Sequence, residues 1–298
     1  MRRSIERIAD AADPRVAAYR GLSDPERLRS QGLFVAEGRF VARRVIEDAR
    51  LPIRSLLVNG AALRDLGPLV DTIDRRVPIY VCETAGFLGI TGFPIHRGCL
   101  ALVERPAALS IVEALGTATT AIVLEGVTNP DNIGGVFRNA AAFGAGAVVL
   151  SPTCGDPLYR KAVRTSMGAV LRVPFARASE WPAALTGIRE AGFTVAALTP
   201  REPSEPIDRF AERWAGGAGQ ARRARHPKIA LLVGTEGAGL TPDAESAADV
   251  RVRIPISDAV DSLNLAVAVG IGLFKVQGSR FKVQGSRFKV RRTQNLEP

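Results

Sequence analysis

The sequence predicts an α/β protein with two domains. Short apolar runs bounded by glycine, proline or polar residues alternate with helical segments along most of the chain, which is the pattern of βαβ units. The length of 298 residues suits about two domains. A stretch with Pro, Gly and Thr separates two such alternations. We therefore expect domains over 1–106 and 119–275, a linker with one short helical run over 107–118, and a tail over 276–298.

The first domain is expected to be a small α/β unit. Residues 4–29 alternate small apolar and charged residues, and we expect one or two short helices there. In the next helical segment Val41, Val45 and Ala49 share one stripe, as in a helix with one buried face. The strands expected here are 34–36, 53–58, 77–82 and 98–103, with helices at 39–49 and 61–69.

The second domain shows a longer alternation of the same kind. Asn132 and Thr241 are expected to be helix N-caps, and Pro242 occupies a favourable first helical position. Residues 201–227 show no periodic apolar pattern, and we expect an irregular excursion there. The expected strands are 121–124, 147–150, 171–174, 194–198, 229–233 and 250–254, with helices at 133–143, 156–169, 180–191 and 262–274.

A glycine-rich turn after strand 229–233 is the most informative stretch. Gly234, Gly237 and Gly239 allow positive φ and a close approach of backbone to a ligand, and Glu236 is its single acidic residue. A strand, a turn of this kind and a helix start form a typical site at the carboxyl end of an α/β sheet. An ordinary tight connection has the same local pattern, so the turn alone does not define a function.

Composition excludes several kinds of site. Three widely spaced cysteines form neither a disulfide framework nor a CxxC metal site. With two histidines in the chain, a zinc centre or a Ser-His-Asp triad is not expected, and we predict no metal. The first ten residues lack the apolar segment of a secretory signal, and the chain has no run of eighteen apolar residues. We expect a cytoplasmic protein without a membrane span.

The positive charge is concentrated at the end of the chain. Seven Lys or Arg and no acidic residue lie in 275–292, so the rest of the chain is only mildly basic despite a net charge of +10. Residues 274–280 are repeated without change at 281–287, and Gly and Ser in each repeat argue against a coiled coil. We interpret this tail as a solvated basic arm.

Three segments together resemble a known family. They are 129–140 (Asn-Pro-Asp-Asn-Ile-Gly-Gly-Val-Phe-Arg-Asn-Ala), the turn 234–240, and 254–256 followed by 261–266. In this order and spacing they resemble the three signature motifs of the SpoU (TrmH-type) RNA 2′-O-ribose methyltransferases of the SPOUT superfamily. The resemblance covers about 119–275. Residues 30–106 resemble, more loosely, the L30e-like substrate-binding domain that often precedes the catalytic one.

The resemblance implies a trefoil-knotted methyltransferase domain with a parallel sheet, preceded by the small L30e-like α/β domain. It further implies S-adenosylmethionine as cofactor, ribosomal or transfer RNA as substrate, and a homodimer that completes each site from two chains. The cofactor-binding positions carried over to this sequence are Leu198, Thr199, Gly234, Ile254 and Leu263. Glycine-rich strand ends would supply the dry slot and backbone groups that adenine needs.

The resemblance also assigns the central catalytic role to Arg138. A guanidinium keeps its proton in proteins, so we expect Arg138 to stabilise the developing alkoxide and to bind an RNA phosphate rather than to act as a base. Asn132 would fix the first-motif turn or the ribose, and Glu236 would orient Arg138 or a loop. Ser262 and Asn264 would hold the cofactor end and the knot closure.

Two other function classes were compared with this one. A catalytically silent RNA-binding relative would have no need of Asn132, Arg138, Glu236, Ser262 and Asn264 together. A nucleotide-dependent oxidoreductase would need a glycine fingerprint after its first strand, and that fingerprint is absent. Helix capping remains an alternative reason for Asn132 and Ser262.

Overall fold

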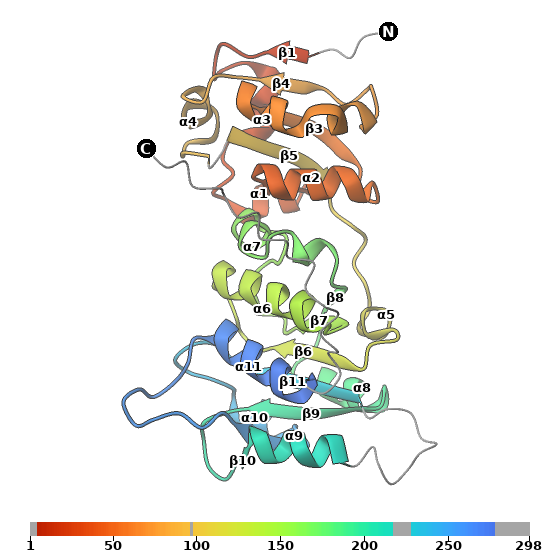
Figure 1. Ribbon diagram of the computed structural model, residues 1–298, viewed down its shortest axis with the longest axis vertical. Coiled ribbons are helices and arrows are strands. Elements are labelled where there is room, and N and C mark those ends of the chain that lie inside the picture. The colour runs from red at the N-terminus through yellow and green to blue at the C-terminus, as the bar shows by residue number, and fades with distance from the viewer. Residues whose placement is uncertain (1–4, 96–97, 217–227, 278–298) are drawn as a thin grey trace, which may run out of the picture.

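The structure is a computed structural model that describes residues 5–95, 98–216 and 228–277. Within these residues the chain forms one sheet of five strands and one of seven. The two sheets belong to separate units that follow each other along the long axis of the molecule, with α6 (Pro130–Phe143) and α7 (Arg160–Thr165) between them (Figure 1). Most of the predicted tail, from residue 278 onward, lies outside the described residues.

The N-terminal unit has a mixed sheet in the order β1-β4-β3-β5-β2. The pairs β1·β4 and β3·β4 are parallel, whereas β5 runs antiparallel to both β2 and β3. Its strands are β1 (Ile5–Arg7), β2 (Leu33–Glu37), β3 (Ile53–Val58), β4 (Ile79–Val81) and β5 (Cys99–Glu104). Its helices are η1 (Pro14–Tyr19), α1 (Pro25–Arg29), α2 (Arg39–Asp48), α3 (Gly60–Leu66), η2 (Gly67–Thr72) and α4 (Gly86–Thr91).

The second unit has a parallel sheet in the order β10-β12-β9-β11-β6-β7-β8. Its strands are β6 (Thr120–Leu124), β7 (Ala147–Leu150), β8 (Phe175–Arg177), β9 (Phe193–Leu198), β10 (Glu205–Pro206), β11 (Lys228–Val233) and β12 (Val250–Arg253). Besides α6 and α7 its helices are α5 (Ile111–Leu115), η4 (Ala169–Leu171), α8 (Ala184–Glu190), α9 (Ile207–Gly216), α10 (Pro242–Ser246) and α11 (Leu265–Gln277).

Alternate residues of the parallel strands face two different apolar layers. In β11, Leu231 and Val233 pack with α6, α9 and α11, whereas Ala230 and Leu232 pack with α5, α8 and α10. Both faces are therefore covered by helices, and the strands read as continuous apolar runs, as expected for a parallel sheet. The layer that contains α6 continues into the helices α2 and α3 of the N-terminal unit, so one apolar cluster includes residues of both units.

A buried ion-pair cluster also joins the two units. The Glu37 side chain, at the end of β2, is fully buried and accepts hydrogen bonds from Arg160 Nη1 at 2.9 Å and Arg164 Nη1 at 2.8 Å, both on α7. The Arg160 guanidinium also lies 3.8 Å from the centre of the Phe93 ring. Breaking a buried pair of this kind leaves a charge without compensation.

The structure corrects three of the expected elements and adds one helix. Residues 4–29 include the strand β1 at the sheet edge besides η1 and α1, and α4 is a helix that was not expected. The strand expected at 171–174 begins later, at Phe175, because residues 169–171 form the 3-10 helix η4. The first half of 201–227 is not irregular: β10 and the helix α9 form there, and residues 217–227 lie outside the described part.

Two expected helix starts are also wrong. The N-cap of α6 is Asn129, whose side chain accepts a hydrogen bond from Asp131 N, so Asn132 lies inside the helix and is not its cap. Helix α11 begins at Leu265 rather than at Ser262. Its first turn is capped by Asn264, whose Oδ1 accepts from Val267 N. By contrast Thr241 caps α10 as predicted, with Pro242 at the first position.

Candidate active site

A cavity lies at the carboxyl ends of the parallel strands β9, β11 and β12, and we call it the strand-end cavity. The ends of parallel strands meet at one edge of a sheet, which brings together segments far apart in the sequence. All five predicted cofactor positions line this cavity, and Glu236 and Ser262 line it as well. The lining residues are Leu198, Thr199, Pro200, Val233, Gly234, Thr235, Glu236, Gly237, Gly239, Ile254, Ile256, Ser262, Leu263, Leu265 and Ala268.

The glycine-rich turn forms one wall of the cavity with its backbone. A Cβ on Gly234 would lie 2.1 Å from the carbonyl carbon of Gly239, a contact that no side chain can make. Gly237 and Gly239 have φ of 83° and 72°, in the region that favours glycine. The turn closes on itself through the hydrogen bond from Gly239 N to Thr235 O. These glycines are therefore required by the shape of the turn.

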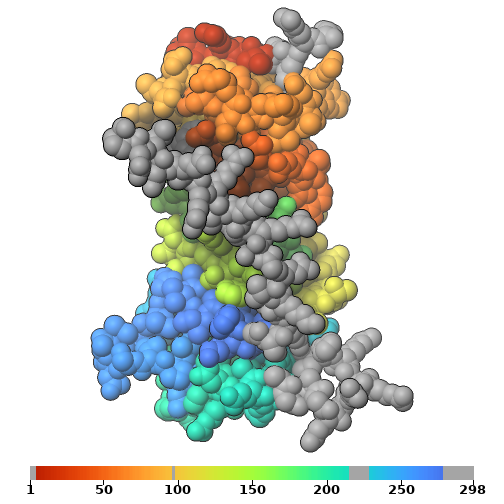
Figure 2. Space-filling view, in the orientation of Figure 1, coloured from red at the N-terminus to blue at the C-terminus, as the bar shows by residue number. Residues whose placement is uncertain are grey.

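The long connection from β12 to α11 also lines the cavity, through Ile256, Ser262 and Leu263. Residues 255–262 are mostly exposed and protrude from the side of the second unit (Figure 2). Ser262 is exposed at the rim of the cavity, and Leu263 is half-buried within it. Ser262 lies before the helix, so the alternative that it caps α11 is wrong.

Three predicted polar residues meet beside the cavity. Asn264 Nδ2 donates to Asn132 Oδ1 at 3.0 Å and to Glu236 Oε1 at 2.9 Å. Asn132 is buried in the first turn of α6, whereas Asn264 and Glu236 are exposed. Each of these residues belongs to a different sequence motif, so Asn264 links all three motifs. Glu236 therefore bonds to the segment before α11, and among the described residues it has no hydrogen bond or ion pair with Arg138.

Arg138 lies on a different surface. Its side chain is exposed on α6 and, within the described residues, has no hydrogen bond or ion pair. Its side chain lines a shallow hollow between α6 and α11, and it does not line the strand-end cavity. The hollow also contains Gly135, Asn139, Phe143, Ala266, Val267, Gly270, Ile271 and Phe274. Within a single chain, the predicted catalytic arginine and the predicted cofactor positions therefore line different hollows.

Helices α6 and α11 approach each other closely beneath this hollow. A Cβ on Gly135 would lie 2.6 Å from the Ala266 Cβ, so a larger residue would push the helices apart. Asn139 Nδ2 donates to Ala266 O at 2.5 Å and packs against Gly270. The position of Asn264 at the start of α11 is thereby fixed relative to α6.

Two buried carboxylates support the cavity and were not singled out in the sequence. Glu125, directly after β6, accepts from Trp181 Nε1 at 2.6 Å, Thr241 N at 2.9 Å and Thr241 Oγ1 at 2.7 Å. Glu245 accepts from Thr199 Oγ1 at 2.8 Å, next to the cavity. An acidic residue directly after an apolar strand was the available signal for Glu125.

Arg201 fixes the glycine-rich turn from outside. Its guanidinium donates to Leu240 O at 3.1 Å and Ala238 O at 3.0 Å, and it pairs with Glu245 at 3.3 Å. These bonds connect the end of β9 to the turn after β11.

The described residues contain no group of His, Cys, Asp and Glu that could hold a metal ion. No helix in the described ranges is long and apolar enough to cross a membrane.

Comparisons with known proteins point to one family. Residues 119–274 match the model of the SpoU rRNA Methylase family. An uncharacterized tRNA/rRNA methyltransferase of Mycobacterium tuberculosis is 37% identical over 279 residues, which cover 91% of each chain. A 23S rRNA (guanosine-2′-O-)-methyltransferase RlmB of Nitrosomonas europaea is 30% identical over 216 residues, covering 71% of this chain and 77% of that protein.

Solved structures of similar proteins have the same fold. The AdoMet-bound rRNA methyltransferase of Sinorhizobium meliloti aligns with a TM-score of 0.75 at 24% identity, covering 93% of this chain and 99% of that one. A crystal structure described as an RNA 2′-O ribose methyltransferase aligns with a TM-score of 0.71 at 25% identity, covering 92% and 99%.

Proposed function

The chain belongs to the SpoU rRNA methylase family and is an S-adenosylmethionine-dependent RNA 2′-O-methyltransferase, and we propose how its residues divide this task. The observation that carries the proposal is that all five predicted cofactor positions line one cavity, beside the point where three sequence motifs meet. The substrate is a ribose 2′-hydroxyl in ribosomal or transfer RNA, and the enzyme acts in the cytoplasm, where these RNAs are methylated.

The strand-end cavity is the proposed cofactor site. Leu198, Ile254 and Leu263 give it an apolar lining, and the strand ends and the glycine-rich turn offer backbone hydrogen-bonding groups, a combination that suits an adenosyl group. When bound, S-adenosylmethionine supplies an electrophilic methyl group on a sulfonium. The cavity measures about 170 Å³, below the ~300–1,000 Å³ of most ligand sites. We propose that the exposed connection 255–262 moves outward to admit the cofactor.

Arg138 is the proposed catalytic residue. The 2′-hydroxyl is a weak nucleophile whose oxygen gains negative charge as its proton leaves. A guanidinium that keeps its proton stabilises that charge without acting as a base. Arg138 is exposed and free of ion pairs within the described residues, so its donors are available to an RNA phosphate or to the reacting oxygen.

Asn132, Glu236 and Asn264 are the proposed positioning residues. Their hydrogen bonds hold the start of α6, the glycine-rich turn and the start of α11 in one arrangement. Ser262 lines the cavity, and its hydroxyl is the proposed partner of the polar end of the cofactor.

Two finer features of the fold belong to the same proposal. The segment from β12 to α11 borders the glycine-rich turn on the far side of the cavity, and we propose that it passes through the preceding loop as a trefoil knot. The N-terminal unit, with helices on both faces of a mixed sheet, is the proposed L30e-like RNA-binding domain. The proposed boundaries stay at 1–106, 107–118, 119–275 and 276–298.

A homodimer would unite Arg138 with a cofactor site. Val267 and Phe274 are 50% and 58% exposed on α11, although both are large apolar residues, and they line the hollow that contains Arg138. A second copy packed on this surface would bury them in a two-fold contact. It would also bring Arg138 of one chain towards the strand-end cavity of its partner.

Calorimetry and RNA methylation test the function directly. The protein is expected to bind S-adenosylmethionine and to form 2′-O-methylated nucleosides in transcribed 23S rRNA, detected by mass spectrometry after digestion. RNA binding without cofactor binding would instead identify a catalytically silent relative. Binding of a nicotinamide dinucleotide in place of S-adenosylmethionine would contradict the proposed cofactor.

Complementation tests the shared site. Subunits that carry Arg138→Ala are mixed with subunits that carry Gly234→Ala, and the mixture should recover activity. In each heterodimer one of the two sites then contains an intact arginine and an intact cofactor turn. An active monomer in sedimentation at assay concentration would contradict the dimer and the shared site.

A further inference from the structure

A second cavity lies between the two units, and we call it the arginine cleft. It forms where the N-terminal unit, the connection after β5 and the edge strand β8 meet, and its volume is about 760 Å³. Asp156 is the only acidic residue among the described residues that line it. Five arginines line the same cleft: Arg29, Arg50, Arg105, Arg172 and Arg177.

Carboxylates balance only part of this charge. Arg50 pairs with Asp48, which lies outside the lining of the cleft. Asp156 is occupied by Arg105, whose Nη1 and Nη2 each donate to it at 2.8 Å. Arg29 pairs with Glu26, but this is a surface pair in which Glu26 is 70% exposed, so it holds Arg29 weakly. The Arg172 side chain is exposed and makes no hydrogen bond or ion pair within the described residues.

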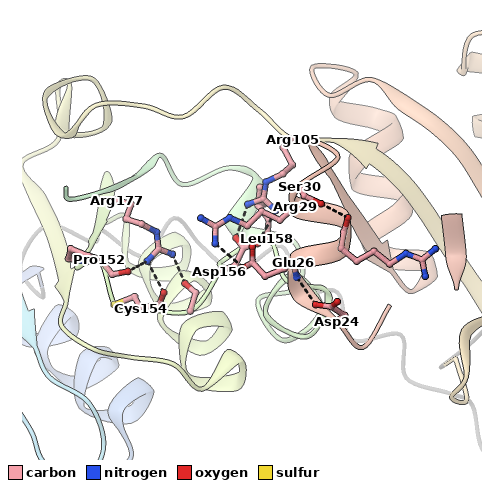
Figure 3. Close-up of polar contacts among 12 residues, drawn as sticks. Asp24, Glu26, Arg29, Ser30, Arg105, Pro152, Cys154, Asp156, Leu158 and Arg177 are labelled. Atoms are coloured by element: carbon pink, nitrogen blue, oxygen red, sulfur yellow. Dashed lines mark hydrogen bonds and ion pairs between the residues drawn. The ribbon is translucent and has the colours of Figure 1, made fainter. Parts of the chain in front are cut away.

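Arg177 is the most unusual of the five. Its guanidinium donates to the carbonyl oxygens of Ser151, Pro152, Cys154 and Gly155 at 2.7–3.1 Å, and no carboxylate pairs with it in the described chain. Figure 3 shows Arg29, Arg105 and Arg177 gathered around the segment that contains Cys154 and Asp156.

Electrostatics at Arg177 agree with this geometry. Burial lowers the pKa of the Arg177 guanidinium most. The positive charges of Arg29 and Arg105 lower that pKa further, whereas the nearby Asp156 raises it. Arg177 is therefore close enough to Arg29 and Arg105 to be repelled by both, and an anion bound beside them would relieve this repulsion.

We propose that the arginine cleft binds a backbone phosphate of the RNA substrate. Guanidinium groups recognise phosphate oxygens in a fork geometry, and the cleft presents several of them on surfaces from both units. This inference rests on the proposed function, because it assigns a second contact to the same RNA.

The position of the cleft indicates what this contact does. It lies beside β7 and β8, at the opposite end of the strand order from β9 and β12, whose ends form the strand-end cavity. A phosphate bound there belongs to a part of the RNA away from the methylated nucleotide. Such a contact sets the position of the RNA and carries no base information.

The salt dependence of RNA binding tests the proposal. The double variant Arg29→Gln, Arg172→Gln removes two cleft charges that have no buried partner, and its matched control Arg64→Gln, Arg209→Gln removes two exposed charges from the same two units outside the cleft. Affinity for transcribed 23S rRNA is measured by filter binding over a range of salt concentrations.

The cleft variant is expected to bind this RNA about tenfold or more weakly, and its slope of log affinity against log salt should be shallower by about 1.5. The control variant should stay within about twofold of the unmodified protein. Melting temperature and S-adenosylmethionine affinity should be unchanged in both variants, which separates lost RNA contact from misfolding.

Three other outcomes are informative. Equal affinities and slopes for the two double variants would overturn the proposal. A second result would also overturn it: equal slopes for the two double variants, together with a higher melting temperature of the unmodified protein, but not of the cleft variant, when inorganic phosphate or ADP is added. The cleft would then bind a small phosphate compound and not RNA. The unmodified protein could also fail to transfer methyl groups while the cleft variant still loses RNA affinity. This result would support RNA binding at the cleft and contradict only the proposed function.

Discussion

Around the strand-end cavity the protein contributes backbone and apolar side chains, whereas the boundary between the two units combines a shared apolar layer with buried charged side chains. Gly234 and the turn after β11 shape the first region through contacts that leave no room for a Cβ. Glu37 with Arg160 and Arg164 holds the second region through buried ion pairs. The first region is therefore sensitive to added volume and the second to lost charge, and the two kinds of change should affect different properties of the enzyme.

Adding one methyl group to the cavity turn should have the largest effect. In Gly234→Ala the new Cβ would meet the backbone of Gly239, which cannot move aside as a side chain could. We expect cofactor binding to become undetectable in calorimetry and the free energy of unfolding to fall by about 3 kcal/mol. Gly187→Ala is the matched control, since its Cβ would meet no atom within 4 Å. Normal cofactor affinity in Gly234→Ala would place the cofactor elsewhere.

Removing Arg138 should reduce activity without affecting either region's structure. We expect Arg138→Ala to lower the rate of methyl transfer about 10²–10³-fold, which is typical for loss of one donor to a developing oxyanion. Cofactor affinity and melting temperature should not change, because the side chain is exposed and does not line the strand-end cavity. Arg209→Ala, at an exposed helical arginine, serves as the control. More than about a tenth of the original rate would correspond to a loss under 1.4 kcal/mol, too small for the main catalytic group.

At the boundary, removing charge should affect stability and leave the cavity intact. Glu37→Gln leaves the largely buried Arg160 without its carboxylate, and we expect the free energy of unfolding to fall by about 2 kcal/mol in denaturant titration. This is below the usual range for buried pairs because Arg164 is 43% exposed and is screened by water. Glu205→Gln, which breaks the surface pair with the mostly exposed Arg213, should have little effect. Reduced cofactor affinity in Glu37→Gln would show that the two regions are coupled.

The smallest expected effect concerns the hydroxyl that connects the cavity turn to the buried Glu125. Thr241→Ala removes the N-cap bond to Ala244 N and the bond to Glu125 Oε1. We expect a loss of about 1 kcal/mol in the free energy of unfolding, together with a modest decrease in cofactor affinity. Thr241→Ser retains the hydroxyl and should restore both quantities. If the alanine and serine variants are equally stable, the hydroxyl does not support the turn.

The sequence predicted best those features that depend on local patterns. Residues 147–150 form a strand with the predicted bounds because a short run of apolar residues between turns has few alternatives. The cofactor positions could be expected to meet because the carboxyl ends of parallel strands lie at one edge. Helix α9 was missed although Ile207, Phe210 and Trp214 follow a helical spacing, because this short apolar stripe lies within a polar segment rich in Gly, Ala and Arg.

Contacts between distant segments could not be predicted. The local sequence predicted Asn132 as a helix cap, but Asn129 takes that position. The Asn132 side chain instead accepts a hydrogen bond from Asn264, 132 positions later in the chain. The buried pairing of Glu37 with α7 depends on how the two units dock, and no local pattern encodes it. The resemblance to a family indicated Arg138, and the structure adds that it is apart from the strand-end cavity within one chain.

The strand order of the second sheet has a consequence for biosynthesis. β11 lies between β6 and β9, although it is made after both of them. Until Lys228–Val233 has left the ribosome, β6 and β9 have no partner on one side, and their apolar edges stay open to wrong pairing. The sheet must therefore be completed by inserting a late strand into its middle, a slow step that depends on distant contacts. The nascent protein should accordingly depend on chaperones until synthesis is nearly finished.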